Sequence, residues 1–435
     1  MKETRASFAL LFFIIAVHIA HLLPQTNSVS EISQSYPATV CPSAVSDARA
    51  TDLFPNKSSL IRAIDRPQAD LKRNGQGSYL QNSGAIYQEG NPVNTIQIQS
   101  KSNRWTAALT CDVGSAVAWF VGGTANVTSQ NKLILVNSGL GDAIVDVTSF
   151  SENGPTATVP VTVKPSSEKV IRVDSFDPGS NRLVLRVETR SGRVTTYFLD
   201  ERVRGLNNIG GDFIAPIENA AKEIVIAGLP VKYGSTAKAI HKLRMMTPGN
   251  VDADVNVEVI SPEGVFIPVG FSDISLKSQQ VRELDLSEVD LGSKTFALKI
   301  EATQPVVAAV LTEAKTGSVS DFMWSTASQP FGNVSYNLYG LEPMISLVGE
   351  RILVNVAWRN NRGRELEKTL IGEEVLNWKV PSGARLISIT NQSGVKGAMN
   401  WISRDGITRL PLQQGANLES SKRPVADIAV IQPKK

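Results

Sequence analysis

The chain repeats its own pattern, and this repetition constrains its fold more than any other feature. The run Lys132-Leu133-Ile134-Leu135-Val136 recurs as Lys242-Leu243-Arg244-Met245-Met246. Further along, Ala143, Val145, Val147 and Gly154 match Ala253, Val255, Val257 and Gly264 at the same offset of about 110 residues. Such repetition indicates that one small folding unit was duplicated. It predicts architecture and says little about chemistry.

The apolar positions are the ones that both copies keep. In the second copy, Val255 and Val257 alternate with polar residues such as Asp254. A period of two places the valines on one face of a strand and the polar residues on the other. In the first copy Ile144 stands where Asp254 stands, so the outward face has changed while the inward face has not. Both copies therefore predict the same half-buried strand.

Turn signals separate these short alternating runs. Asn153-Gly154-Pro155 matches Pro262-Glu263-Gly264. Each copy is predicted to end in a strand pair, one turning at Ser191-Gly192 and the other near Gln304-Pro305. Turns about every 8 to 12 residues between alternating runs are typical of β-sandwiches. A third, shorter copy is predicted from the apolar run that starts at Ile352 and from the segment between Lys379 and Ile387.

The predicted fold class is all-β, with tandem immunoglobulin-like β-sandwiches after an N-terminal apolar helix and an extended arm. The chain has 435 residues, 42% of them apolar and 20% charged, which describes a globular protein too long for one small core. The predicted division is a signal peptide or membrane anchor (1–28), a low-complexity arm (29–100), and sandwiches at 101–215, 216–330 and 331–435, the last a degenerate copy.

The amino terminus predicts export. Lys2 and Arg5 precede an apolar run from Ala6 to Leu23. A positive end followed by an apolar run is typical of a secretory signal. A cleaved signal peptide and an uncleaved anchor both remain open, and the length of the run, about 18 residues, slightly favours the anchor. We expect an extracytoplasmic protein, either secreted or attached to the membrane through this segment.

The chain has two cysteines, Cys41 in the arm and Cys111 at the edge of the first sandwich. In an oxidising compartment, a pair of cysteines is most simply one disulfide. Closing a loop of this length stabilises a fold by roughly 4 kcal/mol. Two free thiols are the alternative, since the bond requires that the two residues meet in space.

Residues for common catalytic chemistry are few. Of three histidines, His18 and His21 lie in the export segment, which leaves His241. A serine triad, a cysteine–histidine pair or a histidine-rich metal site would all depend on that one imidazole. No phosphate loop, dinucleotide fingerprint or nucleophile elbow is present in the sequence. We therefore expect no catalytic residues, no cofactor, no metal site and no enzyme activity.

Three acidic segments resemble parts of known sites. Asp252, Asp254 and Asn256 resemble a calcium-loop spacing, but Val257 occupies the position where that loop needs glycine. The pairs Asp200-Glu201 and Glu373-Glu374 face opposite ways if they lie on strands, which favours surface charges over a carboxylate pair for glycoside hydrolysis.

Tryptophans offer a binding hypothesis. Trp358, Trp378 and Trp401 all fall in the last predicted sandwich, while Trp105, Trp119 and Trp324 lie near the edges of the predicted modules. A tryptophan face can stack on a sugar ring, although core packing is the simpler role for each of them. The first three are the candidate ligand contacts. The net charge of +3 makes nucleic acid a poor candidate partner.

The segment Trp119-Phe120-Val121-Gly122-Gly123-Thr124, followed by Leu133-Ile134-Leu135-Val136-Asn137, resembles an uncharacterised exported actinobacterial domain-of-unknown-function family (5719-like). The motif Gln304-Pro305-Val306-Val307-Ala308-Ala309 is similar to the last-strand motif of its tandem repeats. The resemblance implies an envelope location and tandem sandwiches, and it implies no activity.

These observations lead to one main expectation of function. We expect a non-catalytic cell-envelope protein that acts as a binding module for an envelope glycan or an envelope protein. The alternatives are a purely structural extracytoplasmic stalk and an accessory to a carbohydrate-active envelope enzyme.

Overall fold

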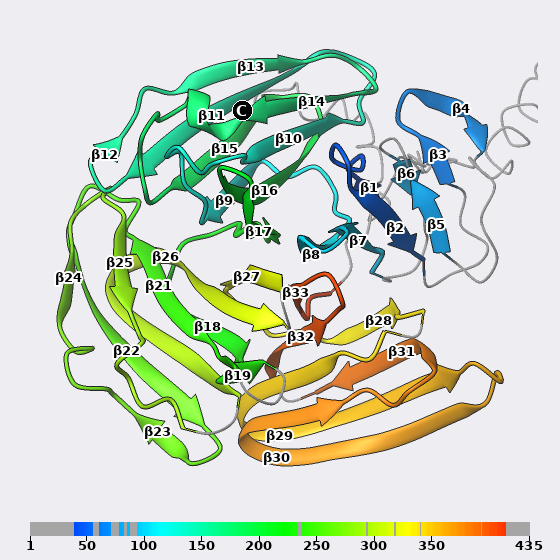
Figure 1. Ribbon diagram of the computed structural model, residues 1–435, viewed down its shortest axis with the longest axis vertical. Helices are drawn as coiled ribbons and strands as arrows, with labels where there is room; N and C mark the ends of the chain where they lie inside the picture. The colour runs from blue at the N-terminus through cyan, green and yellow to red at the C-terminus, as the bar shows by residue number, and fades with distance from the viewer. Residues whose placement is uncertain are drawn as a thin grey trace, which may run out of the picture. The chain divides into compact units, whose positions relative to one another are not determined.

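The computed structural model describes residues 39–54, 61–70, 78–81, 85–87, 94–233, 237–292, 295–316, 319–339, 341–392 and 394–414. All of them belong to one unit, Tyr36–Asn417. They are almost entirely β, in several packed sheets (Figure 1), which confirms the all-β, sandwich-like prediction. The predicted apolar segment 1–28 lies outside the described residues. Among the described residues, no helix has the length and apolar character needed to cross a bilayer.

A first group of strands forms two four-stranded sheets, ordered β1-β6-β3-β4 and β5-β2-β7-β8. The bounds are β1 (Thr39–Cys41), β2 (Arg49–Leu53), β3 (Ile61–Ala63), β4 (Arg66–Asp70), β5 (Ser78–Gln81), β6 (Ala85–Tyr87), β7 (Ile96–Lys101) and β8 (Trp105–Thr110).

This group corrects the predicted extended arm (29–100), because most of its strands lie within those residues. Asp52, Gln97 and Gln99 are fully buried there. The Gln97 amide donates to Asp52 Oδ1 at 2.8 Å and to the Pro42 carbonyl at 2.9 Å. Polar side chains that satisfy one another can occupy a core, so a polar composition concealed these strands from a search for apolar alternation.

The second group contains two sheets, ordered β14-β10-β16-β17 and β12-β11-β15-β9, with β13 paired to β11. The bounds are β9 (Val117–Val121), β10 (Lys132–Asn137), β11 (Ala143–Ser151), β12 (Gly154–Pro155), β13 (Val159–Val163), β14 (Ser167–Arg172), the 3-10 helix η1 (Val173–Ser175), β15 (Val184–Ser191), β16 (Val194–Arg204) and β17 (Asn207–Ile214).

The third group is an eight-stranded sheet that contains the path β23-β22-β26-β21-β25, together with the small pair β19-β20. The bounds are β18 (Ala221–Leu229), β19 (Lys232–Tyr233), β20 (Ala237–Lys238), β21 (Ile240–Met246), β22 (Ala253–Ser261), β23 (Gly264–Phe266), β24 (Ile274–Leu276), β25 (Arg282–Asp285), β26 (Phe296–Thr316) and β27 (Val319–Thr326).

The fourth group follows the order β28-β31-β29-β32-β33, with β30 paired to β29. The bounds are β28 (Asn333–Asn337), β29 (Met344–Asn360), β30 (Glu365–Lys379), β31 (Ala384–Asn391), β32 (Lys396–Ile402) and β33 (Ile407–Pro411).

The second and third groups pair their strands in a corresponding way. Strand β10 pairs with β14 and β16, as β21 pairs with β25 and β26. On β22, Val255, Val257 and Val259 are buried while Asp254 is exposed. The predicted half-buried strand, with its valines on the inward face, is therefore confirmed.

The predicted strand pair with a turn at Ser191-Gly192 is wrong. Strand β15 pairs with β11 and β9, whereas β16 pairs with β10 and β17, so the chain crosses from one sheet to the other at this point. In the third group the single strand β26 makes the same crossing, its first half pairing with β22 and its second half with β21. A polar turn signal marks a change of direction but does not identify the strand that follows as a hairpin partner.

Four strands, the last of each group, form a shared centre. Strand β8 packs against β17, β17 against β27, β27 against β33, and β33 against β8. We call β8, β17, β27 and β33 the inner strands.

The carboxylate of Asp321 on β27 connects all four inner strands. Its Oδ1 accepts the backbone N–H groups of Gly211 at 3.0 Å and Phe322 at 2.9 Å. Its Oδ2 accepts those of Ile407 at 3.0 Å and Thr106 at 3.4 Å. Burial raises the pKa of Asp321 well above its ordinary value, and the four amide donors oppose that rise.

A second polar layer lies one step along the same strands. Asp212 on β17 accepts the Trp324 N–H at 2.7 Å and the Thr408 hydroxyl at 3.3 Å. The Thr408 oxygen in turn accepts the Ala108 N–H at 2.8 Å. Each of the two layers therefore links the same four strands, because the donors of one strand are matched by acceptors on its neighbours.

Glycine provides the space for the Asp321 carboxylate. A Cβ on Gly406 would lie 1.9 Å from Asp321 Oδ2 and 2.7 Å from the Thr106 nitrogen. A Cβ on Gly210, whose φ is +146°, would lie 2.6 Å from Asp321 Oδ1. Any other side chain at these positions would push the carboxylate away from its donors.

The expectation that Asp200 and Glu201 are surface charges is also wrong, since both are buried. Asp200 pairs with Arg202 at 2.6 Å and accepts the Trp324 indole N–H at 2.8 Å. Glu201 pairs through Oε1 with Lys101 at 2.6 Å and through Oε2 with Lys132 at 2.8 Å. The two carboxylates have different partners, because Asp200 pairs with Arg202 of the same strand and bonds to β27, whereas Glu201 pairs with lysines of β7 and β10.

We predict that Asp321→Asn lowers the free energy of unfolding by on the order of 3–5 kcal/mol, because the amide replaces one acceptor oxygen by a donor that faces buried N–H groups. Urea denaturation measured beside the wild-type chain tests this. The control is Asp142→Asn, an exposed position, for which a change within about 0.5 kcal/mol is expected. Equal effects of the two substitutions would show that Asp321 does not hold the inner strands together.

Candidate functional site

The three predicted contact tryptophans lie in one hydrophobic cluster of the fourth group. The rings of Trp358 and Trp378 are 5.7 Å apart between centroids and tilted by 53°. Trp378 exposes 8% of its surface and Trp401 exposes 5%, whereas Trp358 is partly buried. The faces of Trp378 and Trp401 are used in packing, so this placement does not support stacking of a ligand on either of them.

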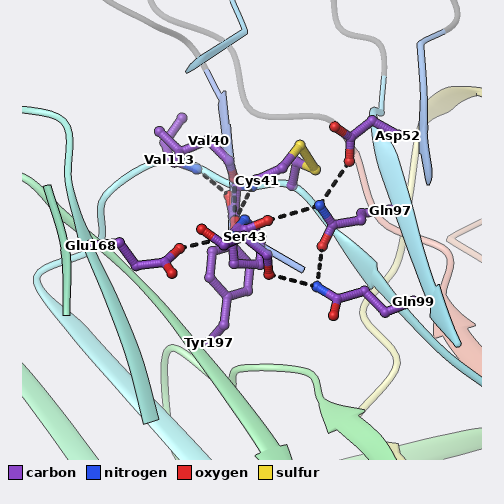
Figure 2. The surroundings of a disulfide bond; sticks show 12 residues. Val40, Cys41, Ser43, Asp52, Gln97, Gln99, Val113, Glu168 and Tyr197 are labelled. Atoms are coloured by element: carbon purple, nitrogen blue, oxygen red, sulfur yellow. Dashed lines mark hydrogen bonds between the residues drawn. A yellow bond between two sulfur atoms is a disulfide. The ribbon is translucent and has the colours of Figure 1, made fainter. Parts of the chain in front are cut away.

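The structure brings the two cysteines together in a disulfide, Cys41–Cys111, with an S–S distance of 2.00 Å (Figure 2). The bond joins β1 to the residue that follows the inner strand β8. The two cysteines are 70 residues apart in sequence. A cross-link of this span attaches the first group to the shared centre.

Several hydrogen bonds lie beside the disulfide, as Figure 2 shows. The Tyr197 hydroxyl donates to the Val40 carbonyl, and the Val40 N–H donates to the Asp112 carbonyl at 2.8 Å. The Ser43 N–H donates to Glu168 Oε2 at 2.8 Å, which connects the first group to β14 of the second. This network fixes the start of the first group against β14 and β16.

Asp52 is fully buried beside the disulfide, and the ligand atoms of Cys41, Asp52 and Cys111 lie within 4.8 Å of one another. Because the two sulfur atoms are bonded to each other, neither is free to bind a metal in this state. Asp52 Oδ2 has no hydrogen-bond partner. Burial raises the pKa of Asp52 to about 8, and the hydrogen bond from Gln97 opposes the rise.

His241 serves the core. It is buried, with Nδ1 at 3.0 Å from the Thr312 hydroxyl and Nε2 at 3.1 Å from the Pro230 carbonyl. Its ring packs edge-on against Phe296 at 5.2 Å.

A pocket of about 450 Å³ lies between the second and third groups. We call it the seam pocket. Its lining includes Trp119, Phe150, Arg186, Asn250, Gln279 and Gln304. The pocket thus combines aromatic rings, a guanidinium group and side-chain amides.

Neighbouring strands of the second group form the aromatic wall of the seam pocket. Trp119 on β9 is directly opposite Arg186 on β15 in the sheet register. The Arg186 guanidinium carbon lies 5.7 Å from the centroid of the Trp119 ring, within the range of a cation–π contact. The Phe150 ring on β11 lies 5.7 Å from the Trp119 ring, tilted by 40°.

Two loops of the third group and strand β26, which carries Gln304, form the polar wall. The Gln279 amide donates to Asn250 Oδ1 at 3.3 Å. The Val281 N–H donates to the Ser151 carbonyl at 2.9 Å and so joins the two groups beside the pocket. Trp119 stands out in the sequence, but its polar neighbours Asn250, Gln279 and Gln304 lie 131 to 185 residues further along the chain, and no local pattern marks them as parts of one site.

The fold and the two sides of this pocket define a protein of packed β-groups with a ligand-sized pocket between them. The chain belongs to the family of unknown function DUF5719, whose profile matches residues 84–339. The match confirms the expectation that the chain belongs to an uncharacterised family. No curated protein matches the chain.

Three solved structures show weak likeness. One, "Crystal Structure of Thermotoga maritima 1070", has 19% identity and a TM-score of 0.20, covering 22% of this chain and 87% of that one. An α-L-rhamnosidase of Streptomyces avermitilis complexed with L-rhamnose has 9% identity and a TM-score of 0.14, covering 89% of this chain and 56% of that one. A tetra-tandem repeat from the extending region of a large adhesion protein has 11% identity and a TM-score of 0.10, covering 91% and 98%. None of the three supports a functional assignment.

We predict that Asp52→Asn changes how stability depends on pH. In the unfolded chain the Asp52 carboxyl group has a pKa of about 3.9, whereas in the folded protein its pKa is about 8. The folded state therefore keeps a proton that the unfolded state releases, and the stability contribution present below about pH 4 is lost as pH rises to about 8. The asparagine variant keeps an oxygen that accepts the hydrogen bond from Gln97. Because asparagine does not titrate, its stability should not fall in this way as pH rises.

Urea denaturation of both proteins at several pH values between about 4 and 9 tests this prediction. The wild-type chain should lose stability relative to the variant as pH rises. A difference between the two proteins that stays constant with pH would contradict the assignment.

Proposed function

We propose that this chain is a non-catalytic protein of the cell envelope that binds an envelope polysaccharide in the seam pocket. The observation that carries the proposal is the combination of the Trp119 and Phe150 rings with the Arg186, Asn250, Gln279 and Gln304 side chains around one pocket of about 450 Å³. A pocket of this size is in the range of those that bind small molecules, and it suits one or two sugar units.

The chemistry of the lining suits a polyhydroxyl ligand. Side-chain amides both donate and accept hydrogen bonds, as sugar hydroxyl groups do. The Trp119 and Phe150 rings expose only 8% and 5% of their surfaces, so they give the pocket an apolar base rather than an open stacking face, and the guanidinium group adds further donors. We therefore assign recognition of the sugar to the polar side chains of the pocket and not to ring stacking, because Trp119 is as buried as Trp378.

An extracytoplasmic location is part of the proposal. The Cys41–Cys111 disulfide supports it, because such bonds persist in oxidising compartments. The basic and apolar character of residues 1–28 supports export and attachment to the membrane through that segment. We propose no cofactor, no metal and no nucleic-acid partner.

A protein partner, a structural stalk and an accessory role beside a carbohydrate-active enzyme are the alternatives. Packing of all four groups through the inner strands favours a binding module over a stalk, since a stalk needs units joined only end to end.

We predict that Arg186→Ala/Gln304→Ala reduces retention of the chain on isolated envelope polysaccharide by at least about tenfold, because it removes donors from the pocket without removing a core side chain. Retention is measured in a pull-down at low and at high salt, on polysaccharide and on solubilised envelope protein in parallel.

The matched control is Arg172→Ala. Arg172 also pairs with a carboxylate two residues ahead, Asp174, as Arg186 pairs with Glu188, but it lies outside the pocket. Retention on protein alone would favour an assembly partner. Binding to polysaccharide that survives the double substitution would reject the seam pocket as the glycan site.

A further inference from the structure

A second pocket, of about 530 Å³, opens where the inner strands end. We call it the axial pocket. Thr110, Thr326 and Pro411, the last residues of β8, β27 and β33, line it, and Pro216 lines it just after β17. All four inner strands therefore bring their carboxyl ends to this pocket. It is separate from the seam pocket and shares no lining residue with it.

The charged side chains of the axial pocket are acidic. Asp112 and Glu218 line it, and the described lining includes no lysine, arginine or histidine. Asp112 Oδ1 accepts the Val113 N–H at 2.8 Å, and within the described part of the chain neither carboxylate forms an ion pair with a basic side chain. Burial, together with the charge of Glu218 and against the hydrogen bond from the Val113 N–H, raises the pKa of Asp112 to about 6. The pocket thus has negative charge that no basic side chain of its lining balances.

A buried acceptor accompanies the two carboxylates. Asn94 lines the same pocket and is 2% exposed. Its amide nitrogen donates to the Gln413 carbonyl at 2.7 Å, which orients the side chain. Its Oδ1 has no hydrogen-bond partner. A buried acceptor left without a donor is costly, so a ligand that supplies a donor would stabilise the site.

We propose that the axial pocket binds a small organic molecule that carries a primary ammonium group. An ammonium group has three N–H donors, which suits a pocket with two carboxylates and a free amide oxygen, and its positive charge balances the lining. Further amides, such as Gln329 and Gln414, line the pocket and suit hydroxyl or amide groups on the rest of the ligand.

Two other ligand classes fit less well. A neutral sugar would have no aromatic surface to contact, since the described lining has no tryptophan, tyrosine or phenylalanine. A calcium ion needs six to eight closely spaced oxygen ligands, and a pocket of about 530 Å³ is much larger than such a cage.

Isothermal titration calorimetry on the full chain tests the proposal with two ammonium probes, glucosamine and 1,5-diaminopentane. Their neutral counterparts are N-acetylglucosamine and 1,5-pentanediol. At least one ammonium probe should bind, and its affinity should fall at least about tenfold in Asp112→Asn/Glu218→Gln. The asparagine keeps the acceptor for the Val113 N–H, so the variant preserves local structure.

The control variant, Asp142→Asn/Glu288→Gln, removes two exposed charges outside the pocket and should leave the affinity unchanged. Equal binding of a neutral counterpart, no binding of either ammonium probe, or unchanged affinity in the pocket variant would each overturn the proposal. Displacement of the probe by calcium chloride at equal concentration would also overturn it, in favour of a metal site.

Discussion

The Asp321 carboxylate is the interaction on which the arrangement of the four strand groups depends. One side chain accepts backbone N–H groups from β8, β17, β27 and β33, and so specifies which strands meet and in which register. Apolar packing alone tolerates sliding of one sheet on another, whereas a buried acceptor with four donors does not. Gly210 and Gly406 are needed beside it because any Cβ there would occupy the space of the carboxylate.

Buried charge continues outward from this centre. Asp200, Arg202 and Trp324 form one contact set, and Glu201 with Lys101 and Trp105 forms another. Each carboxylate has both a basic partner and an indole N–H donor, so the cost of its burial is offset within the network. Such networks favour one arrangement of the groups over others, because any other pairing would leave a buried charge unmatched.

Both proposed pockets follow from how the groups pack. The seam pocket forms where β9 and β15 of the second group meet β26 and the loops after β21 and β24 of the third. The axial pocket forms where the inner strands end, beside Cys111 of the disulfide. Residues that are unremarkable in sequence, such as Asn250 and Glu218, gain a proposed role only through this proximity.

The sequence by itself determined the all-β class and the inward faces of strands such as β22, because period-two alternation is local and directly visible. It also supplied the two cysteines. Only the tertiary structure decided that the polar segment of Gln97 and Gln99 folds into sheets, that Asp200 and Glu201 are buried, and that Trp378 and Trp401 belong to a core. The reason is physical: whether a polar or aromatic side chain lies inside or outside depends on partners that are distant in sequence, and those partners become neighbours only when the inner strands come together.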